Sequence, residues 1–332
     1  MELKRVVVTG LGALTPIGNT IPEFWNSLIN GVSGAAPITH YDPEKFRTKF
    51  ACEVKNFNPE DFMDKKEARK LDPFVHYAIA ASDEAIKDAG LDFPNLDTNR
   101  IGVIWGSGIG GLKTFTDEVV NFAHGDGTPR FNPFFIPKMI LDIAPGHISI
   151  RHGLRGPNFS TVSACASSTN ALIDAFNYIR LNMADVIVSG GSEAIINEAG
   201  MGGFNAMHAL STRNDDPTTA SRPFDKDRDG FVAGEGAGSI ILEELEHAKA
   251  RGAKIYAEII GFGESGDANH ITSPVMDGPL RAMKAALEMV KSITGEYPKI
   301  DYINAHGTST PVGDKNETAA IKALFEVKDI PL

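Results

Sequence analysis

Cys165 is the residue of this sequence best suited to covalent chemistry, and it lies in a run of small and hydroxyl residues from 160 to 170. The segment from Phe159 to Val162 is typical of a strand end, and apolar residues between 172 and 179 recur at helical spacing. Cys165 is therefore predicted where a strand turns into a helix. The positive end of that helix favours the thiolate, which is the nucleophilic form. An inert buried thiol is the alternative interpretation of such an isolated cysteine.

A second group of reactive side chains is the segment Asn304-Ala305-His306-Gly307-Thr308-Ser309-Thr310. It follows a predicted strand, Ile300 to Ala305, and ligands of open α/β sheets gather outside the carboxyl ends of strands. The His306 imidazole can donate a hydrogen bond to a carbonyl oxygen that becomes negative in a transition state. A structural histidine in a turn is the alternative. Cys165 and His306 are far apart in sequence, so only the fold can bring them together.

Composition limits the class of protein. The chain has 332 residues, of which 42% are apolar and 23% charged, which is typical of a soluble globular protein. The net charge of −11 argues against nucleic acid as a partner. With only Cys52 and Cys165, a disulfide framework or a metal cluster is not expected, and a free thiol suits the cytoplasm. No apolar segment reaches membrane length without glycine or charge, so we expect a cytoplasmic protein with no membrane partner.

The segment Asp225 to Gly230 imitates the start of a calcium-binding EF-hand loop. The twelfth position of that loop would be Gly236 instead of glutamate, so we reject a calcium site. We expect neither a metal nor a cofactor in this protein.

The elements that must position these residues indicate an α/β fold. The apolar run from Ala184 to Gly191 suits a strand buried on both faces, hence a parallel sheet under helices. The segment from Arg5 to Thr9 is predicted as a strand that ends in a glycine turn, 10–15. This turn resembles half of a dinucleotide fingerprint, but close backbone packing explains its glycines equally well. A similar strand and glycine pair recurs at 255–263, which suggests two related halves, 1–254 and 255–332, the second with an incomplete sheet.

Residues 65–89 form a predicted helical segment whose start is basic, with Lys66, Arg69 and Lys70 close together. On an acidic protein this patch is a candidate docking surface for an acidic partner. A merely solvated helix start is the alternative.

Taken together, these stretches resemble the β-ketoacyl-acyl carrier protein synthases, most closely the KAS II condensing enzymes of fatty-acid synthesis. The matching stretches are 6–12, 106–111, 153–157, 163–167, 209–215, 222–231 and 306–310. The resemblance implies a thiolase-like fold with α-β-α-β-α layers from two similar halves, as a homodimer.

The resemblance also implies a 3-oxoacyl-[acyl-carrier-protein] synthase reaction. Cys165 would receive an acyl chain from an acyl carrier protein as a thioester. Malonyl-carrier protein would then lose CO₂, and its carbanion would attack that thioester. His306 would stabilise the enolate, the backbone N–H of Cys165 would be one oxyanion donor, and Thr308 and Thr310 would contact the pantetheine arm.

By the same resemblance, Ile109, Phe135 and Phe204 would line the acyl pocket near the dimer interface. Lys66, Arg69, Lys70 and Arg213 would contact the acidic carrier protein.

The family carries a second catalytic histidine, a lysine and a glycine-rich phenylalanine loop beyond its first histidine. No such motif follows His306 in this sequence, although the segment from Asp314 to Glu317 is present. We therefore expect a truncated synthase that can accept an acyl chain but lacks part of the apparatus for full condensation.

Three other classes share parts of this pattern. A non-catalytic chain-length factor lacks the nucleophile, so an intact Cys165 argues against it. A thiolase favours acyl-CoA and lacks the stretch His306 to Thr310. A polyketide ketosynthase domain is normally embedded in a longer chain.

Overall fold

The computed structural model describes residues 3–270 and 274–326, which form two compact units. Each unit is described by itself. Unit 1 is built from the described parts of Met1–Pro43, Ala51–Gly203 and Ala233–Ile259. Unit 2 is built from the described parts of Glu44–Phe50, Phe204–Val232 and Ile260–Leu332.

A six-stranded sheet in the order β5-β4-β6-β7-β1-β8 forms the centre of unit 1. Its strands are β1 (Val6–Leu14), β4 (Ile101–Gly106), β5 (Asn158–Thr161), β6 (Val186–Glu193), β7 (Gly236–Glu244) and β8 (Ala257–Ile259). β4 pairs in parallel with both β5 and β6, as the prediction of a parallel sheet requires. The prediction is wrong for β7, β1 and β8. β7 is antiparallel to both β6 and β1, and β8 is antiparallel to β1, so the sheet is mixed.

The helices are α1 (Ile21–Ile29), α2 (Lys65–Ala68), α3 (Pro73–Ala89), α4 (Leu112–Ala123), α5 (Phe135–Met139), α6 (Ile143–His152), α7 (Ser167–Arg180), α8 (Glu198–Ala206), α9 (Leu245–Ala250), α10 (Asp277–Thr294) and α11 (Pro311–Phe325). Two further strands are short, β2 (Ala36–Pro37) and β3 (Phe50–Ala51).

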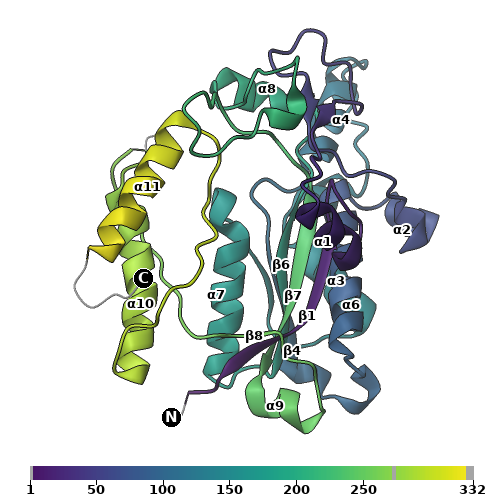
Figure 1. The fold of residues 1–332 in the computed structure, drawn as a ribbon. Coiled ribbons are helices and arrows are strands. Elements are labelled where there is room, and N and C mark those ends of the chain that lie inside the picture. Colours follow the sequence, from purple (N-terminus) through teal and green to yellow (C-terminus); the bar gives the residue numbers. More distant parts are fainter. Residues whose placement is uncertain (1–2, 271–273, 327–332) are drawn as a thin grey trace. The chain divides into compact units, whose positions relative to one another are not determined.

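Helices cover both faces of the unit 1 sheet, with α7 on one face and α3 and α6 on the other (Figure 1). The main core lies between the sheet and α3 with α6, where Phe74, Trp105 and Ile148 are fully buried. Because both faces are covered, the central strand β6 begins with the apolar residues Val186–Val188 and is buried over its first five residues.

The predicted glycine turn at 10–15 is wrong, because β1 continues as a strand to Leu14. Its glycines are needed for close packing instead. A Cβ on Gly12 would overlap the carbonyl oxygen of Ala81, and one on Gly10 would lie 2.8 Å from the Cβ of Ala89. The absence of these side chains lets α3 lie directly on the strand backbone.

The second glycine pair makes the same contact within unit 2. A Cβ on Gly263 would overlap the carbonyl oxygen of Ala282 and lie 2.7 Å from the nitrogen of Ala286, both on α10. The corresponding distance in unit 1, from Gly12 to the nitrogen of Ala85, is also 2.7 Å. The local arrangement of a glycine pair against an alanine-rich helix therefore occurs twice in the chain.

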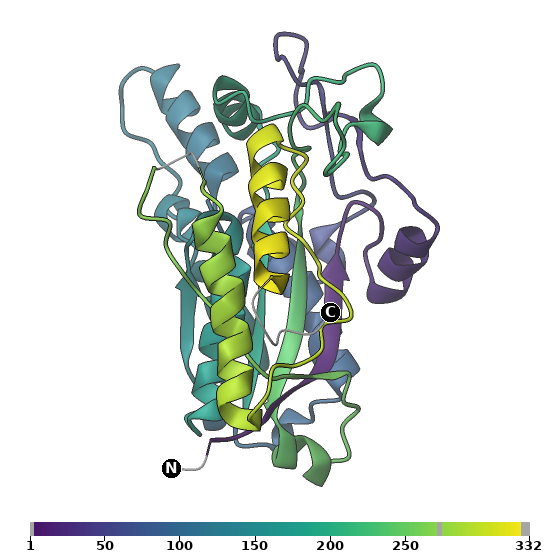
Figure 2. The same cartoon turned by 60° about the vertical axis from the view of Figure 1, so that its left-hand side comes forward.

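The helices α10 and α11 lie side by side in unit 2 and share an apolar contact through Leu287 and Leu324 (Figure 2). The predicted strand from Ile300 to Ala305 is wrong, since residues 297–310 are not part of any strand. A strand needs a neighbour for its backbone hydrogen bonds, and no strand lies between 260 and 326 within the described part of the chain.

The predicted helical segment 65–89 is two helices. Asp72 ends the connection between them, because its carboxylate accepts the backbone N–H of Phe74 and Pro73 then occupies the first turn of α3. The other carboxylate oxygen of Asp72 accepts the N–H and hydroxyl of Thr114. Burial raises the pKa of Asp72, while these hydrogen bonds lower it in part.

In the ranges 3–270 and 274–326, no helix is both long enough and apolar enough to cross a membrane.

Glu243 is a fully buried carboxylate of unit 1. Its carboxylate accepts hydrogen bonds from the Thr9 hydroxyl at 2.7 Å and from His247 at 2.6 Å, and it forms an ion pair with Arg251 at 2.7 Å. Burial raises the pKa of Glu243, but the Arg251 guanidinium and the other two donors outweigh burial and lower it. Arg251 also donates to the carbonyl of Ala89, so the cluster joins β7 to the end of α3.

We expect Glu243→Gln to lower the free energy of unfolding by about 3 kcal/mol at neutral pH, because it leaves Arg251 half-buried without its counter-charge. A lowered native pKa contributes stability above the ordinary carboxyl pKa and loses it as the pH falls through the native one. The difference between the two proteins should therefore shrink below about pH 4 in urea unfolding measurements.

The matched control is Glu246→Gln. Glu246 and Lys249 both lie on α9 and form an ion pair on the surface. This variant should unfold like the parent protein. A Glu243→Gln difference that stays constant down to pH 3 would contradict the assignment.

Candidate active site

Cys165 lies where the sequence predicts it, between a strand and a helix. β5 ends at Thr161, a 3₁₀ turn spans Ala164–Ala166, and α7 begins at Ser167. The Cys165 side chain is exposed, in contrast to that of Cys52, which is half-buried. The positive end of the α7 dipole lies beside Cys165, so negative charge on the sulfur or on an adjacent oxyanion is stabilised there.

Hydrogen bonds of Ser167 stabilise this turn. Its hydroxyl donates to the carbonyl of Ala164 at 2.7 Å and accepts the N–H of Ser163 at 2.9 Å, and its carbonyl accepts the Thr161 hydroxyl at 2.7 Å. Because Ser167 is buried, the turn that carries Cys165 is fixed to the first turn of α7.

Ala164 has a φ of +52°, which is rare for a residue with a side chain. Such a backbone conformation costs of order 1 kcal/mol and persists only where surrounding contacts enforce it. A strained strand-to-helix turn that carries an exposed nucleophile also occurs in the nucleophile elbows of hydrolases.

Two strand glycines let the turn come this close to the sheet. A Cβ on Gly106 would lie 2.5 Å from the carbonyl carbon of Ser167, and one on Gly191 would lie 2.7 Å from the Cβ of Ser168. The start of α7 therefore rests directly on the ends of β4 and β6.

His306 lies in an exposed loop of unit 2 whose backbone is bound by α11. The Glu317 carboxylate accepts the N–H of His306 at 2.7 Å and that of Gly307 at 2.9 Å. The imidazole is thus carried by a backbone that is fixed by a carboxylate instead of a strand ladder.

The next residues of the loop divide into two groups. The hydroxyls of Thr308 and Thr310 lie 3.0 Å apart and are partly exposed. Ser309, between them, is fully buried with a φ of +65°, and its hydroxyl accepts the N–H of Arg222 at 3.0 Å. The inward turn of Ser309 leaves the two threonine hydroxyls close together and accessible to a polar ligand.

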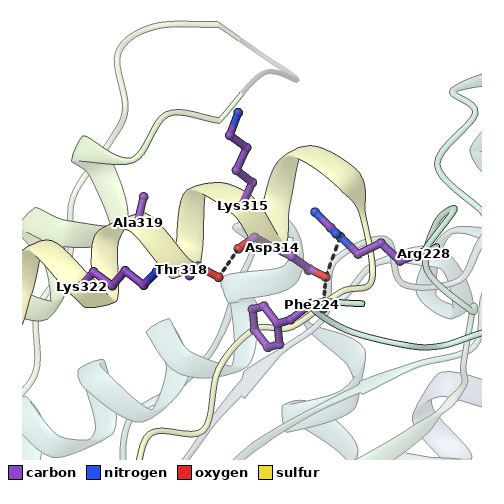
Figure 3. Close-up of a pocket in the computed structure, with 7 residues that line it drawn as sticks. All are labelled: Phe224, Arg228, Asp314, Lys315, Thr318, Ala319 and Lys322. Atoms are coloured by element: carbon purple, nitrogen blue, oxygen red, sulfur yellow. Dashed lines mark hydrogen bonds and ion pairs between the residues drawn. The ribbon is translucent and has the colours of Figure 1, made fainter. Parts of the chain in front are cut away.

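Asp314 joins this loop to the segment 222–230. Its carboxylate accepts the N–H of Ser309 at 3.1 Å and that of Phe224 at 2.7 Å, and it forms an ion pair with Arg228 at 3.1 Å. Figure 3 shows Asp314 at the first turn of α11, facing Arg228 and the backbone of Phe224. These residues line a cavity of about 370 Å³ together with Lys315, Thr318, Ala319 and Lys322.

The three predicted acyl-pocket residues lie in different settings. Ile109 is 41% exposed, on the loop that follows β4. Phe135 begins α5 and stacks on Phe131, with ring centroids 5.5 Å apart. Phe204 lies in unit 2 and meets Phe231 edge-to-face at 5.3 Å.

The predicted carrier-docking residues Lys66, Arg69 and Lys70 are all exposed, around the break between α2 and α3. The Lys70 ammonium lies 5.1 Å from the centre of the Phe134 ring. Arg213 differs from them, since it is half-buried in unit 2 and donates to the carbonyl of Asp227.

Comparison with known proteins assigns the family. The profile of the β-ketoacyl synthase N-terminal domain matches residues 3–248, and that of the C-terminal domain matches residues 256–331. The chain belongs to the β-ketoacyl synthase family. The resemblance seen in the motifs is thereby confirmed.

This β-ketoacyl synthase is 52% identical over 326 residues to 3-oxoacyl-[acyl-carrier-protein] synthase 2 of Staphylococcus aureus (strain N315). The match covers 97% of this chain and 77% of that protein.

Two solved structures confirm the thiolase-like α/β fold of the synthase. A β-ketoacyl synthase from Burkholderia phymatum STM815 has a TM-score of 0.88 at 35% identity, over 97% of this chain and 78% of its own. A type II polyketide ketosynthase in complex with its acyl-carrier protein has a TM-score of 0.83 at 30% identity, over 99% and 80%.

Sequence reasoning did not assign roles to the residues that hold the two reactive loops of the synthase. Asp314 and Glu317 are three residues apart, a spacing that places both on one face of a helix. This spacing was the available signal for a helix whose carboxylates bind the loop of His306. Ser167 gave no such signal, because a serine is ordinary at that position.

We expect Asp314→Asn to loosen the loop that follows His306, because one amide oxygen replaces two carboxylate oxygens and the ion pair with Arg228 is lost. Hydrogen exchange at the amides of Ser309 and Phe224 should accelerate about tenfold or more. The surface variant Asp301→Asn, which breaks the exposed pair with Lys299, is the control and should leave both rates unchanged. Equal exchange in all three proteins would refute the role of Asp314.

Proposed function

We propose that this protein is a 3-oxoacyl-[acyl-carrier-protein] synthase of fatty-acid elongation, with Cys165 as the residue that carries the acyl chain. The observation that carries the proposal is the exposed Cys165 thiol before the start of α7, in a turn whose backbone is strained at Ala164. The name of the S. aureus relative, 52% identical, supports the same reaction.

In the first half-reaction, the Cys165 thiolate attacks the thioester carbonyl of an acyl-carrier protein. A new carbon–sulfur bond forms, the tetrahedral oxyanion collapses, and the pantetheine thiolate leaves and takes up a proton. The positive end of α7 and the backbone N–H of Cys165 stabilise the oxyanion, which is where preorganised donors contribute most.

In the second half-reaction, a malonyl-carrier protein replaces the first carrier. Its carbon–carboxylate bond breaks, CO₂ leaves, and the electron pair remains as an enolate. His306 donates a hydrogen bond to the enolate oxygen. The enolate carbon then attacks the Cys165 thioester, and cleavage of the carbon–sulfur bond regenerates the thiolate.

The polar arm of the carrier is proposed to lie along the loop after His306. The paired hydroxyls of Thr308 and Thr310 support this placement, because one donates to the other and the second can donate to an amide carbonyl of pantetheine, while both oxygens can accept from its amide N–H groups. The buried Ser309 holds the two threonines in this arrangement.

The acyl chain is proposed to enter a pocket lined by Ile109, Phe135 and Phe204, near the interface of a homodimer. Exposed aromatic rings beside Phe135 support an interface there, since Phe115, Phe122, Phe131 and Phe134 are each 39–44% exposed. Apolar surface of this kind on a water-exposed face is typical of a subunit contact.

The carrier itself is proposed to dock on Lys66, Arg69, Lys70 and Arg213. The exposure of Lys66, Arg69 and Lys70 supports a local basic dock for an acidic protein, on a chain whose overall charge is −11 and would otherwise repel it. A related polyketide ketosynthase has been solved in complex with its acyl-carrier protein, so such a complex exists for a relative.

The remaining expectations are also part of this proposal. The protein is assigned to the cytoplasm, and its chain to two related halves, 1–254 and 255–332. The repeated contact of Gly12 with Ala81 and of Gly263 with Ala282 supports the two-half organisation.

Incubation with an acyl-carrier protein should add one acyl group to the chain, which intact mass spectrometry and peptide mapping will place on Cys165. Cys165→Ala should abolish the adduct, because the only other thiol is half-buried and its pKa is raised by burial. Cys52→Ala is the matched control and should be acylated like the parent protein. An adduct on Cys52, or none at all, would overturn the proposal.

Charge reversal at Lys66 and Lys70 to glutamate should raise the KM for acyl-carrier protein about tenfold or more, with little change in kcat. Acylation by a short acyl-pantetheine thioester should be unaffected, because that substrate has no protein to dock. The double reversal Lys249→Glu and Lys284→Glu, at exposed positions of α9 and α10, makes the same change in net charge and is the control. A parallel loss with both substrates would show that the residues are not a docking surface.

A further inference from the structure

Glu193, at the end of β6, binds four consecutive residues of the loop that follows β4. Its carboxylate accepts the N–H groups of Gly108 at 2.7 Å, Ile109 at 3.1 Å and Gly110 at 3.1 Å. The Ser107 hydroxyl donates to it at 3.2 Å. One half-buried side chain therefore accepts three successive backbone N–H groups. The residues of this loop belong to no strand or helix, so the hydrogen bonds of regular structure do not satisfy these groups.

Only a carboxylate can make this set of contacts. Its two oxygens accept all four hydrogen bonds, whereas glutamine has a single acceptor oxygen and would turn its NH₂ group toward other donors. Burial raises the pKa of Glu193, and the four donors lower it in part.

The opposite side of the loop is fixed by α5. The N–H of Gly111 donates to the carbonyl of Met139 at 3.1 Å, and a Cβ on Gly111 would lie 2.6 Å from the Cα of Met139. Gly110 has a φ of +76° and meets the side chain of Leu141. Residues 107–111 are thus held between Glu193 and the end of α5, with little room for the backbone to move.

This loop lies next to the proposed nucleophile. A Cβ on Gly108 would be 2.9 Å from a carboxylate oxygen of Glu193 and 3.4 Å from the carbonyl oxygen of Ala164, the neighbour of Cys165. The next residue, Ile109, exposes 41% of a large apolar side chain. Ile109 is therefore an apolar surface beside the turn that would carry an acyl chain, and its backbone position is set by Glu193.

We propose that Glu193 is a positioning residue that determines the acyl-chain selectivity of Cys165, by holding Ile109 in one place relative to the nucleophile. The inference rests on the proposed function, because it requires Cys165 to accept acyl groups. Glu193 contacts the loop and not the acyl chain, so its effect passes through Ile109.

The test compares Glu193→Gln with the parent protein in acylation by hexanoyl-, decanoyl- and tetradecanoyl-carrier protein, followed as the mass of the Cys165 adduct. We expect the spread of rates across the three chains to narrow by about threefold or more, because a mobile Ile109 discriminates less between chain lengths. The amides of Gly108, Ile109 and Gly110 should exchange about tenfold faster or more.

Glu53→Gln is the matched control, since Glu53 also accepts backbone N–H groups of a loop, those of Thr39 and His40, in the same unit. It should leave the rate profile unchanged. Ile109→Ala should narrow the profile by itself, and adding Glu193→Gln to it should have no further effect.

The outcomes separate this inference from the proposed function. An adduct whose chain-length profile is the same in Glu193→Gln and the parent overturns the inference alone, as does a uniform loss of rate for all three chains. The absence of any adduct on the parent protein overturns the proposed function and the inference with it, while the amide exchange still reports whether Glu193 holds the loop.

Discussion

The contact between the first turn of α7 and the ends of β4 and β6 is the constraint on which the nucleophile depends. Gly106 and Gly191 remove the side chains that would otherwise separate helix from sheet. The turn with Cys165 can then rest on strand backbone, and Ser167 ties it there. Because the turn cannot relax, Ala164 stays at positive φ and the thiol stays exposed at the positive end of the helix. A larger residue at either glycine would displace the nucleophile as a whole.

A second theme is the use of carboxylates to hold loops that carry no strand ladder. Glu193 binds the loop after β4, Glu317 binds the backbone of His306, and Asp314 binds Ser309 and Phe224. In each case an acidic side chain from a regular element accepts N–H groups of an irregular one. Part of the large negative charge of the chain is thus structural, and it lies around both predicted reactive residues. Such charge-assisted hydrogen bonds are shorter and stronger than those between neutral groups, which suits loops that must keep a reactive side chain in place.

Two expectations about the elements were wrong for the same reason. The glycines of β1 were interpreted locally as a turn, although they are strand residues selected by the approach of α3. The segment 300–305 was interpreted locally as a strand, although a strand exists only where another strand pairs with it. Both errors concern contacts with distant parts of the chain, which a local pattern of apolar residues and glycines does not encode. The same limit applies to the mixed sheet, because apolar runs predict burial on both faces but not the direction of the neighbouring strand.

The sequence by itself determined the family and the two reactive residues as candidates, because motif residues such as those around Cys165 and His306 are constrained by chemistry and occur in short, specific stretches. It also placed Cys165 at a strand-to-helix turn, since that transition follows from local periodicity. Only the tertiary structure decided how these residues are held. The carboxylates of Glu193, Glu317 and Asp314 bind loops mainly through backbone N–H groups. Almost every residue of a sequence has such a group, so the residue types of a loop do not show which carboxylate binds it. Which carboxylate meets which loop is therefore set by the packing of helices on glycine-bearing strands and by the return of α11, and it becomes visible only when the chain is folded.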